Sequence, residues 1–157
     1  MQKIKFLITS LSATLFIGCT TIPTIDVMKA ETANFNLPYV PQTNNAVVYV
    51  TRPSDLGGLI RFNVFVDNQE DASEVGFTRN NQYIYCFVKP GEHKIYSKAE
   101  NWAEILINPK AGETVFLRQE PAMGIIMARN SLFKIDDHEG KFHVKTLNLG
   151  TILKTEK

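Results

Sequence analysis

The sequence predicts an all-β fold, an antiparallel β-sandwich of the immunoglobulin-like or transthyretin-like kind with seven to nine strands. Short segments rich in β-branched and aromatic residues recur at roughly ten-residue spacing. Turn-forming residues separate these segments, and no long stretch has the 3.6-residue period of an amphipathic helix. This combination is typical of antiparallel sandwiches.

The first half of the domain contains four predicted strands, at residues 46–51, 62–66, 75–78 and 82–88. Arg52-Pro53 ends the first of them, because proline cannot donate a hydrogen bond to a neighbouring strand. The segment 82–88 is apolar on both faces, as expected of a central strand.

The second half contains further predicted strands at residues 93–99, 104–108, 113–119, 123–128, 132–136 and 142–149. Pro90-Gly91 precedes the first of these, and such a pair favours a tight turn. Asp137-His138-Glu139-Gly140 is rich in turn residues, so we expect a hairpin between the last two strands.

The N-terminus has the features of an export signal. Lys3 and Lys5 make the start basic, and residues 6–17 are apolar or small without a charge. A basic start, a short apolar run and a small residue before the cleavage point define secretory signals. Twelve helical residues rise only about 18 Å, which is too short to cross a hydrocarbon core of roughly 30 Å.

Residues Leu15-Phe16-Ile17-Gly18-Cys19 resemble a lipobox, although Phe16 stands where leucine is usual. We expect cleavage after residue 18 and lipidation of Cys19, since its thiolate would accept the diacylglycerol. The alternative is an ordinary secretory signal with a chance cysteine. Thr20 rather than aspartate follows the cysteine, and by resemblance to Gram-negative sorting rules this favours the outer membrane.

Beyond the signal, the predicted organisation is a lipid-anchored tether at residues 19–43 and one β-sandwich domain at residues 44–157. The tether is rich in Thr, Pro and Asn, with a short helix expected at residues 25–33. Removal of Lys3 and Lys5 leaves 15 basic and 16 acidic residues without a basic block. Nucleic acid is therefore not an expected partner, and the expected membrane contact is the lipid anchor.

Several motifs occur in the order found in a known family. They are Val48–Pro53, Phe62–Asp67, Val75-Gly76, Pro90–His93, Gly112–Val115, Arg118-Gln119, Met123-Gly124 and Ala128-Arg129. Over residues 46–136 the chain resembles the domain of unknown function 2846, with extra residues 69–74 in a hairpin that is usually tight. The resemblance implies a bacterial lipoprotein with an immunoglobulin-like or transthyretin-like sandwich, and it implies no activity.

Four side chains are candidates for binding. Arg52, Arg118 and Arg129 lie in or beside apolar strands, and an arginine fork suits carboxylates or carbonyls. They would contact a ligand or partner, or else cap strand edges and pair with acids. Trp102 is expected in a turn, as an anchor for a protein partner or as a lid over the core.

The remaining polar groups give weaker indications. His138 and His143 lie near Asp136, Asp137 and Glu139, and could converge on a metal if the hairpin forms, but acids and glycine are ordinary turn residues.

The thiol of Cys86 could be a catalytic nucleophile or could pair between chains. It lies in an apolar strand, however, where an inert buried thiol is expected. The loop from Asp67 to Glu74 has oxygen ligands but lacks the spacing of a calcium loop. None of the three histidines lies near a glycine-flanked serine of the kind found in a nucleophile elbow. Catalysis and cofactors are therefore not expected.

Two functions remain open. The first is a non-enzymatic envelope lipoprotein whose sandwich binds an envelope protein or has a structural role. The second is a periplasmic module that binds a small ligand or a metal.

Overall fold

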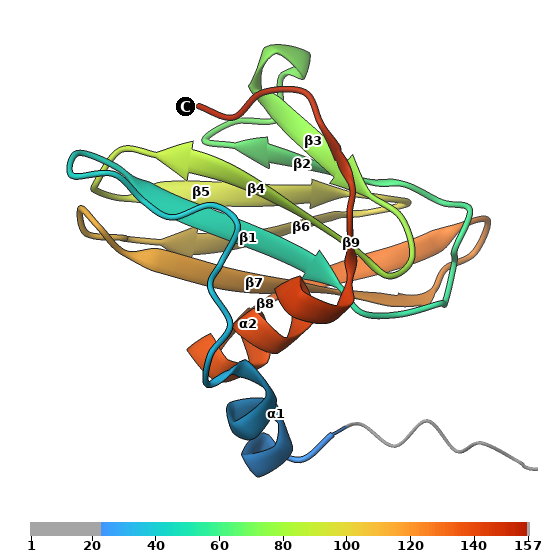
Figure 1. Ribbon diagram of the computed structural model, residues 1–157. Helices are drawn as coiled ribbons and strands as arrows, with labels where there is room; N and C mark the ends of the chain where they lie inside the picture. The colour runs from blue at the N-terminus through green and yellow to red at the C-terminus, as the bar shows by residue number, and fades with distance from the viewer. Residues whose placement is uncertain (1–22, 157) are drawn as a thin grey trace, which may run out of the picture.

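The computed structural model describes residues 23–156 and shows two five-stranded β-sheets packed face to face (Figure 1). The first sheet has the order β8 (Ala128–Ile135), β7 (Thr114–Met123), β1 (Ala46–Arg52), β4 (Gln82–Val88) and β9 (Asn148–Leu149). The second has the order β10 (Thr151–Ile152), β3 (Glu74–Thr78), β2 (Phe62–Val66), β5 (His93–Lys98) and β6 (Trp102–Ile107). The predicted all-β sandwich is confirmed. The described residues contain ten strands, where seven to nine were expected, and two of them, β9 and β10, have only two residues each.

The central strand β1 explains why residues 46–50 are continuously apolar. It pairs antiparallel with β4 and parallel with β7, and every residue in it is buried. A strand covered on both faces loses the alternating pattern of a half-exposed strand. The core between the two sheets is built mainly from valine and isoleucine, including Val48, Val64, Ile84 and Ile95.

The outer face of the first sheet is aromatic and is covered by helix α2 (Asp137–Thr146). Tyr49, Tyr85, Phe116 and Val144 belong to one buried cluster on this face. Figure 1 shows α2 lying across the sheet, with α1 (Ile25–Thr32) beneath it. Neither helix of the described chain has the length and apolarity that a membrane crossing requires.

The predicted hairpin at residues 137–140 is wrong, because these residues form the first turn of α2. Asp137 and Glu139 favour the helix N-terminus electrostatically, as Lys145 does its C-terminus. Gly140 has a packing role rather than a turn role. A Cβ at this position would lie 2.1 Å from Cγ of Phe116, so only glycine lets the helix approach the sheet.

The predicted strand at residues 123–128 is also wrong. β7 and β8 form one long hairpin in which Met123 pairs with Ala128, and the residues between them form its tip. The apolar and β-branched composition suggested a strand, but two isoleucines in this segment are exposed at the turn.

Residues 25–40, called the docked segment below, lie on the domain instead of serving as a free tether. The predicted helix at residues 25–33 is confirmed as α1. Lys145 of α2 donates to the main-chain oxygen of Glu31 at 2.7 Å. Tyr39 stacks on Tyr85 with 3.7 Å between ring centroids, and its main-chain oxygen accepts a 2.6 Å hydrogen bond from the Tyr49 hydroxyl. The folded body therefore begins well before residue 44.

Candidate functional site

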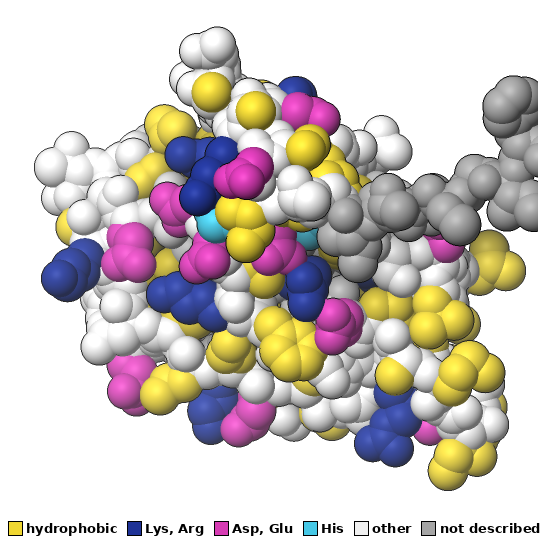
Figure 2. Space-filling view, turned by 90° about the horizontal axis from the view of Figure 1, so that it is seen from below, with side chains coloured by type: hydrophobic (Ala, Val, Ile, Leu, Met, Phe, Trp, Pro, Cys, Tyr) yellow, Lys and Arg dark blue, Asp and Glu magenta, His cyan; other side chains and the backbone are white. Residues whose placement is uncertain are grey.

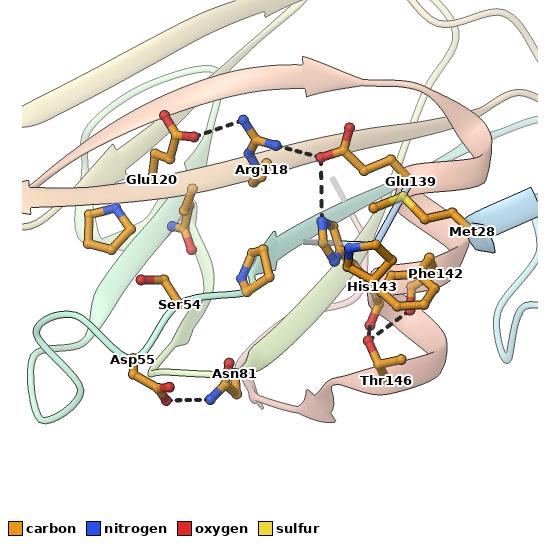
Figure 3. A pocket seen from close by; sticks show the side chains of 14 residues that line it. Met28, Ser54, Asp55, Asn81, Arg118, Glu120, Glu139, Phe142, His143 and Thr146 are labelled. Carbon is orange, nitrogen blue, oxygen red and sulfur yellow. Dashed lines mark hydrogen bonds and ion pairs between the residues drawn. The ribbon is translucent and has the colours of Figure 1, made fainter. Parts of the chain in front are cut away.

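A cavity of about 530 Å³ lies where α1, α2 and β7 meet the loop after β1 (Figure 3). α1 contributes Met28 and α2 contributes Glu139 and His143, while β7 contributes Arg118 and Glu120. The helix reaches this position because its buried face, including His143, packs on the first sheet. The cavity therefore exists only through the helix that the sequence did not predict.

A chain of ionic contacts crosses the cavity. Arg118 donates to Glu120 at 2.8 Å and to Glu139 at 2.5 Å, as Figure 3 shows. Glu139 also lies 3.5 Å from Nε2 of His143, one helical turn further along α2. The guanidinium is therefore neutralised by two carboxylates and is poorly suited to bind an anionic ligand.

The imidazole of His143 is largely desolvated. Burial lowers its pKa, while the carboxylate of Glu139 raises it and the guanidinium of Arg118 lowers it further. Nε of Arg118 and Nε2 of His143 are both buried without a hydrogen-bond partner among the described residues. Both atoms are shielded from solvent, so neither is open to a ligand in this conformation.

The cavity rim carries an acid and a hydroxyl. Asp55 accepts a hydrogen bond from the Asn81 side chain, and the hydroxyl oxygen of Ser54 accepts one from the main-chain N–H of Leu56. With Asp55, Glu120 and Glu139 against one arginine, the lining is net acidic, which favours cationic or neutral ligands.

Arg52, predicted as a binding candidate, is fully buried and has a structural role. It donates to the main-chain oxygens of Leu56, Gly57 and Ile60 at 2.6–2.8 Å. Its guanidinium lies 3.8 Å from the ring centroid of Phe62, and burial lowers its pKa to about 10. It holds the loop after β1 rather than a ligand, in agreement with the structural alternative of a strand-end cap.

Arg129 and Trp102 lie near the end of the sandwich that carries the β7–β8 tip. Arg129 is exposed on β8 and lowers the pKa of Glu100 electrostatically. The expected turn position of Trp102 is wrong, because this residue begins β6. Its ring is 38% exposed and packs against Phe65, with 5.1 Å between centroids.

The structure does not bring together the predicted metal candidates. His138 and His143 lie on one helix, and of the acidic cluster around them only Glu139 and His143 line the cavity. Within residues 23–156, no group of three or more His, Cys, Asp or Glu side chains is placed to hold a metal ion. The predicted convergence of His138 and His143 depended on a hairpin turn at residues 137–140, and these residues belong to helix α2 instead.

The sequence predictions for the two cysteines have different outcomes. Cys86 is buried in β4, and burial raises the pKa of its thiol to about 12, so the thiol is protonated and unreactive at neutral pH. Cys19 and the signal lie outside the described residues.

Sequence reasoning missed the β7–β8 tip as a surface feature. Residues 121–128 contain no polar side chain, yet Ile125 and Ile126 are about nine-tenths exposed. The available signal was an uncharged run with a glycine, Gly124, near its middle. Its interpretation as a buried strand concealed that signal.

Comparisons with known proteins agree with this fold but add no activity. Residues 42–133, from just before β1 into β8, match the family model described as "Protein of unknown function (DUF2846)". A relative from Haemophilus influenzae, described as an uncharacterized protein, is 27% identical over 139 residues, which are 87% of this chain and 79% of the relative. No solved structure matches the chain. Since the family model covers more than half of its length, the chain belongs to the DUF2846 family of proteins of unknown function.

Proposed function

We propose that this protein is an envelope lipoprotein, anchored by lipid on Cys19 in the outer membrane of a Gram-negative bacterium. The basic start, the short apolar run and the lipobox-like residues 15–19 support this proposal. The observation that carries it is the position of the cysteine relative to the fold. Cys19 precedes Ile25, the first residue of α1, so cleavage after residue 18 removes none of the described elements.

In this proposal the sandwich is a non-enzymatic binding or structural domain. Its conspicuous cations are engaged: Arg52 holds a loop, and Arg118 joins two carboxylates. The docked segment makes the lipid anchor continuous with the domain rather than separated from it by a long spacer. The body therefore works close to the lipid surface, where an envelope partner is the expected contact.

The anchor is tested by labelling cells with radioactive palmitate and separating membrane from soluble periplasmic fractions. Wild type and a Cys86→Ala control should be labelled and membrane-bound, whereas Cys19→Ser should be unlabelled and soluble. A Cys19→Ser protein that stays in the membrane at its full precursor mass would contradict lipidation and indicate an uncleaved anchor.

Outer-membrane sorting is tested separately, on a sucrose gradient. Replacement of Thr20 by aspartate should move the protein to the inner-membrane fraction, because aspartate after the lipidated cysteine favours retention there. Wild type in the inner-membrane fraction would contradict this part of the proposal and leave lipidation intact. Crosslinking in cells, followed by identification of the joined proteins, tests for the envelope partner.

A small-ligand module is the second candidate, and the cavity beside α2 favours it. Its lining contains Asp55, Glu120 and Glu139 against one arginine, so it is net acidic. A thermal-shift screen of cationic and neutral metabolites would test this function, with Glu139→Gln as the matched variant. A compound that stabilises wild type but not the variant would support it, and equal shifts would contradict binding at this cavity.

A further inference from the structure

The β7–β8 tip is an exposed apolar surface at one end of the sandwich. Ile125 is 90% exposed, Ile126 89%, Met123 82% and Met127 45%. Leu59, on the neighbouring loop after β1, is 93% exposed. In Figure 2 hydrophobic side chains gather along the right-hand edge, the side on which Figure 1 places the tip and this loop.

The tip has a defined conformation that hydrogen bonds to a side chain stabilise. The carboxylate of Glu100 accepts hydrogen bonds from the main-chain N–H groups of Ile125, Ile126 and Met127 at 3.0, 2.8 and 2.7 Å. A Cβ at Gly124 would lie 2.0 Å from the main-chain oxygen of Met127, so glycine is needed for this tight conformation. The tip therefore presents apolar side chains outward while its N–H groups point inward.

That arrangement suits contact with hydrocarbon. Main-chain polar groups that leave water must find partners within the protein, and here the N–H groups of residues 125–127 already have one. Three backbone hydrogen bonds also lower the pKa of Glu100 to about 2, so the acceptor stays ionised at every physiological pH.

The tip lies on the same part of the molecule as the point where the anchor joins the body. Pro23 and Pro121 line the same cavity, and Pro121 lies two residues before Met123 on β7. Three residues lie between Cys19 and Pro23, so even a fully extended chain places the two no more than about 14 Å apart. A lipid on Cys19 therefore holds the membrane surface within reach of the tip.

Charge around the tip gives no alternative explanation. Arg61 and Lys98 line the shallow depression beside Leu59 and Met127, but Asp71 and Glu74 line it too. The basic and acidic side chains balance, so a purely electrostatic attraction to nucleic acid or anionic lipid is not favoured. The exposed feature that remains is apolar.

We propose that the β7–β8 tip is a second membrane contact, in which Ile125, Ile126 and the flanking methionines enter the leaflet that holds the lipid anchor. The inference rests on the proposed lipidation of Cys19. The anchor raises the effective concentration of the tip at the surface, so a contact too weak to bind alone becomes occupied. The contact in turn orients the sandwich with its β7–β8 tip toward the lipid.

The test uses the full lipidated protein, reconstituted in phosphatidylcholine vesicles with and without brominated acyl chains, which quench tryptophan. All variants carry Trp102→Phe to remove the native signal. Ile126→Trp reports on the tip, and Leu106→Trp, at an exposed position on β6, is the matched control. Ile125→Trp is a second probe if the first variant loses the far-UV circular dichroism of the folded protein.

We expect brominated lipid to reduce the fluorescence of Ile126→Trp at least twofold and to leave that of Leu106→Trp unchanged, at low and high salt alike. Vesicle flotation separates the two proposals. Protein that floats with an unquenched tip overturns the tip contact and leaves the anchor standing, and it would direct the search to a protein partner for the tip. Protein that does not float contradicts the anchor, and the tip contact with it.

Discussion

Replacement of Gly140 by alanine tests the packing of α2 most sharply, because the local and tertiary effects have opposite signs. In an exposed helix interior, alanine is favoured over glycine by about 1 kcal/mol. Here the added Cβ would lie 2.1 and 2.4 Å from Cγ and Cδ1 of Phe116. That ring cannot move freely, since it stacks on Tyr49 with 5.5 Å between centroids.

The expected net effect is destabilisation. Overpacking of a well-packed contact costs about 1–3 kcal/mol, and an overlap with an immobile ring belongs at the upper end. After subtraction of the propensity gain, Gly140→Ala should lower the free energy of unfolding by about 2 kcal/mol. For a domain of this size the melting temperature should fall by roughly 4–8 °C.

Thermal and urea unfolding of the purified protein in mild detergent, followed by circular dichroism, measure this effect. Lys141→Ala, one residue further along the helix, is the control and should change stability by less than about 0.5 kcal/mol. In a Phe116→Leu background the cost of Gly140→Ala should shrink by at least about 1 kcal/mol, since the smaller side chain relieves the overlap. Stabilisation by Gly140→Ala, or additive effects of the two changes, would refute the packing described here.

Three other predictions concern single side chains. Arg52→Met should lower the free energy of unfolding by about 2–3 kcal/mol, because three loop carbonyls lose a charged donor; an effect below about 0.5 kcal/mol in urea unfolding would argue against that role. Cys86, whose pKa burial raises to about 12, should react with iodoacetamide at pH 8 only after unfolding, and prompt labelling of the folded protein would contradict its burial. Glu100→Gln should speed hydrogen exchange at the amides of residues 125–127 at least tenfold. The pKa of Glu100 is lowered from 4.5 to about 2 in the folded protein, so the wild-type protection should persist at neutral pH. It should disappear as the pH falls from about 4.5 through 2, because the carboxylate is then protonated. Protection that is unchanged below that range would oppose this assignment.

Most strands could be predicted because their composition reflects burial directly. Residues 46–50 and 83–86 are buried on both faces, so continuous apolar and aromatic runs marked them without any knowledge of their neighbours. The pairing of the strands was harder to predict from the sequence. β1 runs parallel to β7, and no local feature of either strand indicates that direction.

The failures have tertiary causes. Gly140 resembled a turn residue, but its absent side chain is explained by Phe116, which lies 24 positions earlier. The isoleucines of the β7–β8 tip resembled a buried strand because apolar residues at a turn run against the usual rule.

The candidate site was only partly predictable for the same reason. Arg118, Glu139 and His143 were each noticed in the sequence, but only the docking of α2 brings them into one chain of contacts. Arg52 could not be distinguished from a ligand-binding arginine, since its three acceptors are main-chain oxygens that any sequence would supply.

The central claim is that lipid on Cys19, close in sequence to the docked segment, holds the sandwich at the membrane. Mass spectrometry of the protein purified from membranes tests this claim most directly. The account predicts a mature N-terminal peptide that begins at Cys19 and carries a diacylglycerol thioether with or without an added acyl chain. A peptide that retains any of residues 1–18, or that begins at Cys19 with a free thiol, would contradict it.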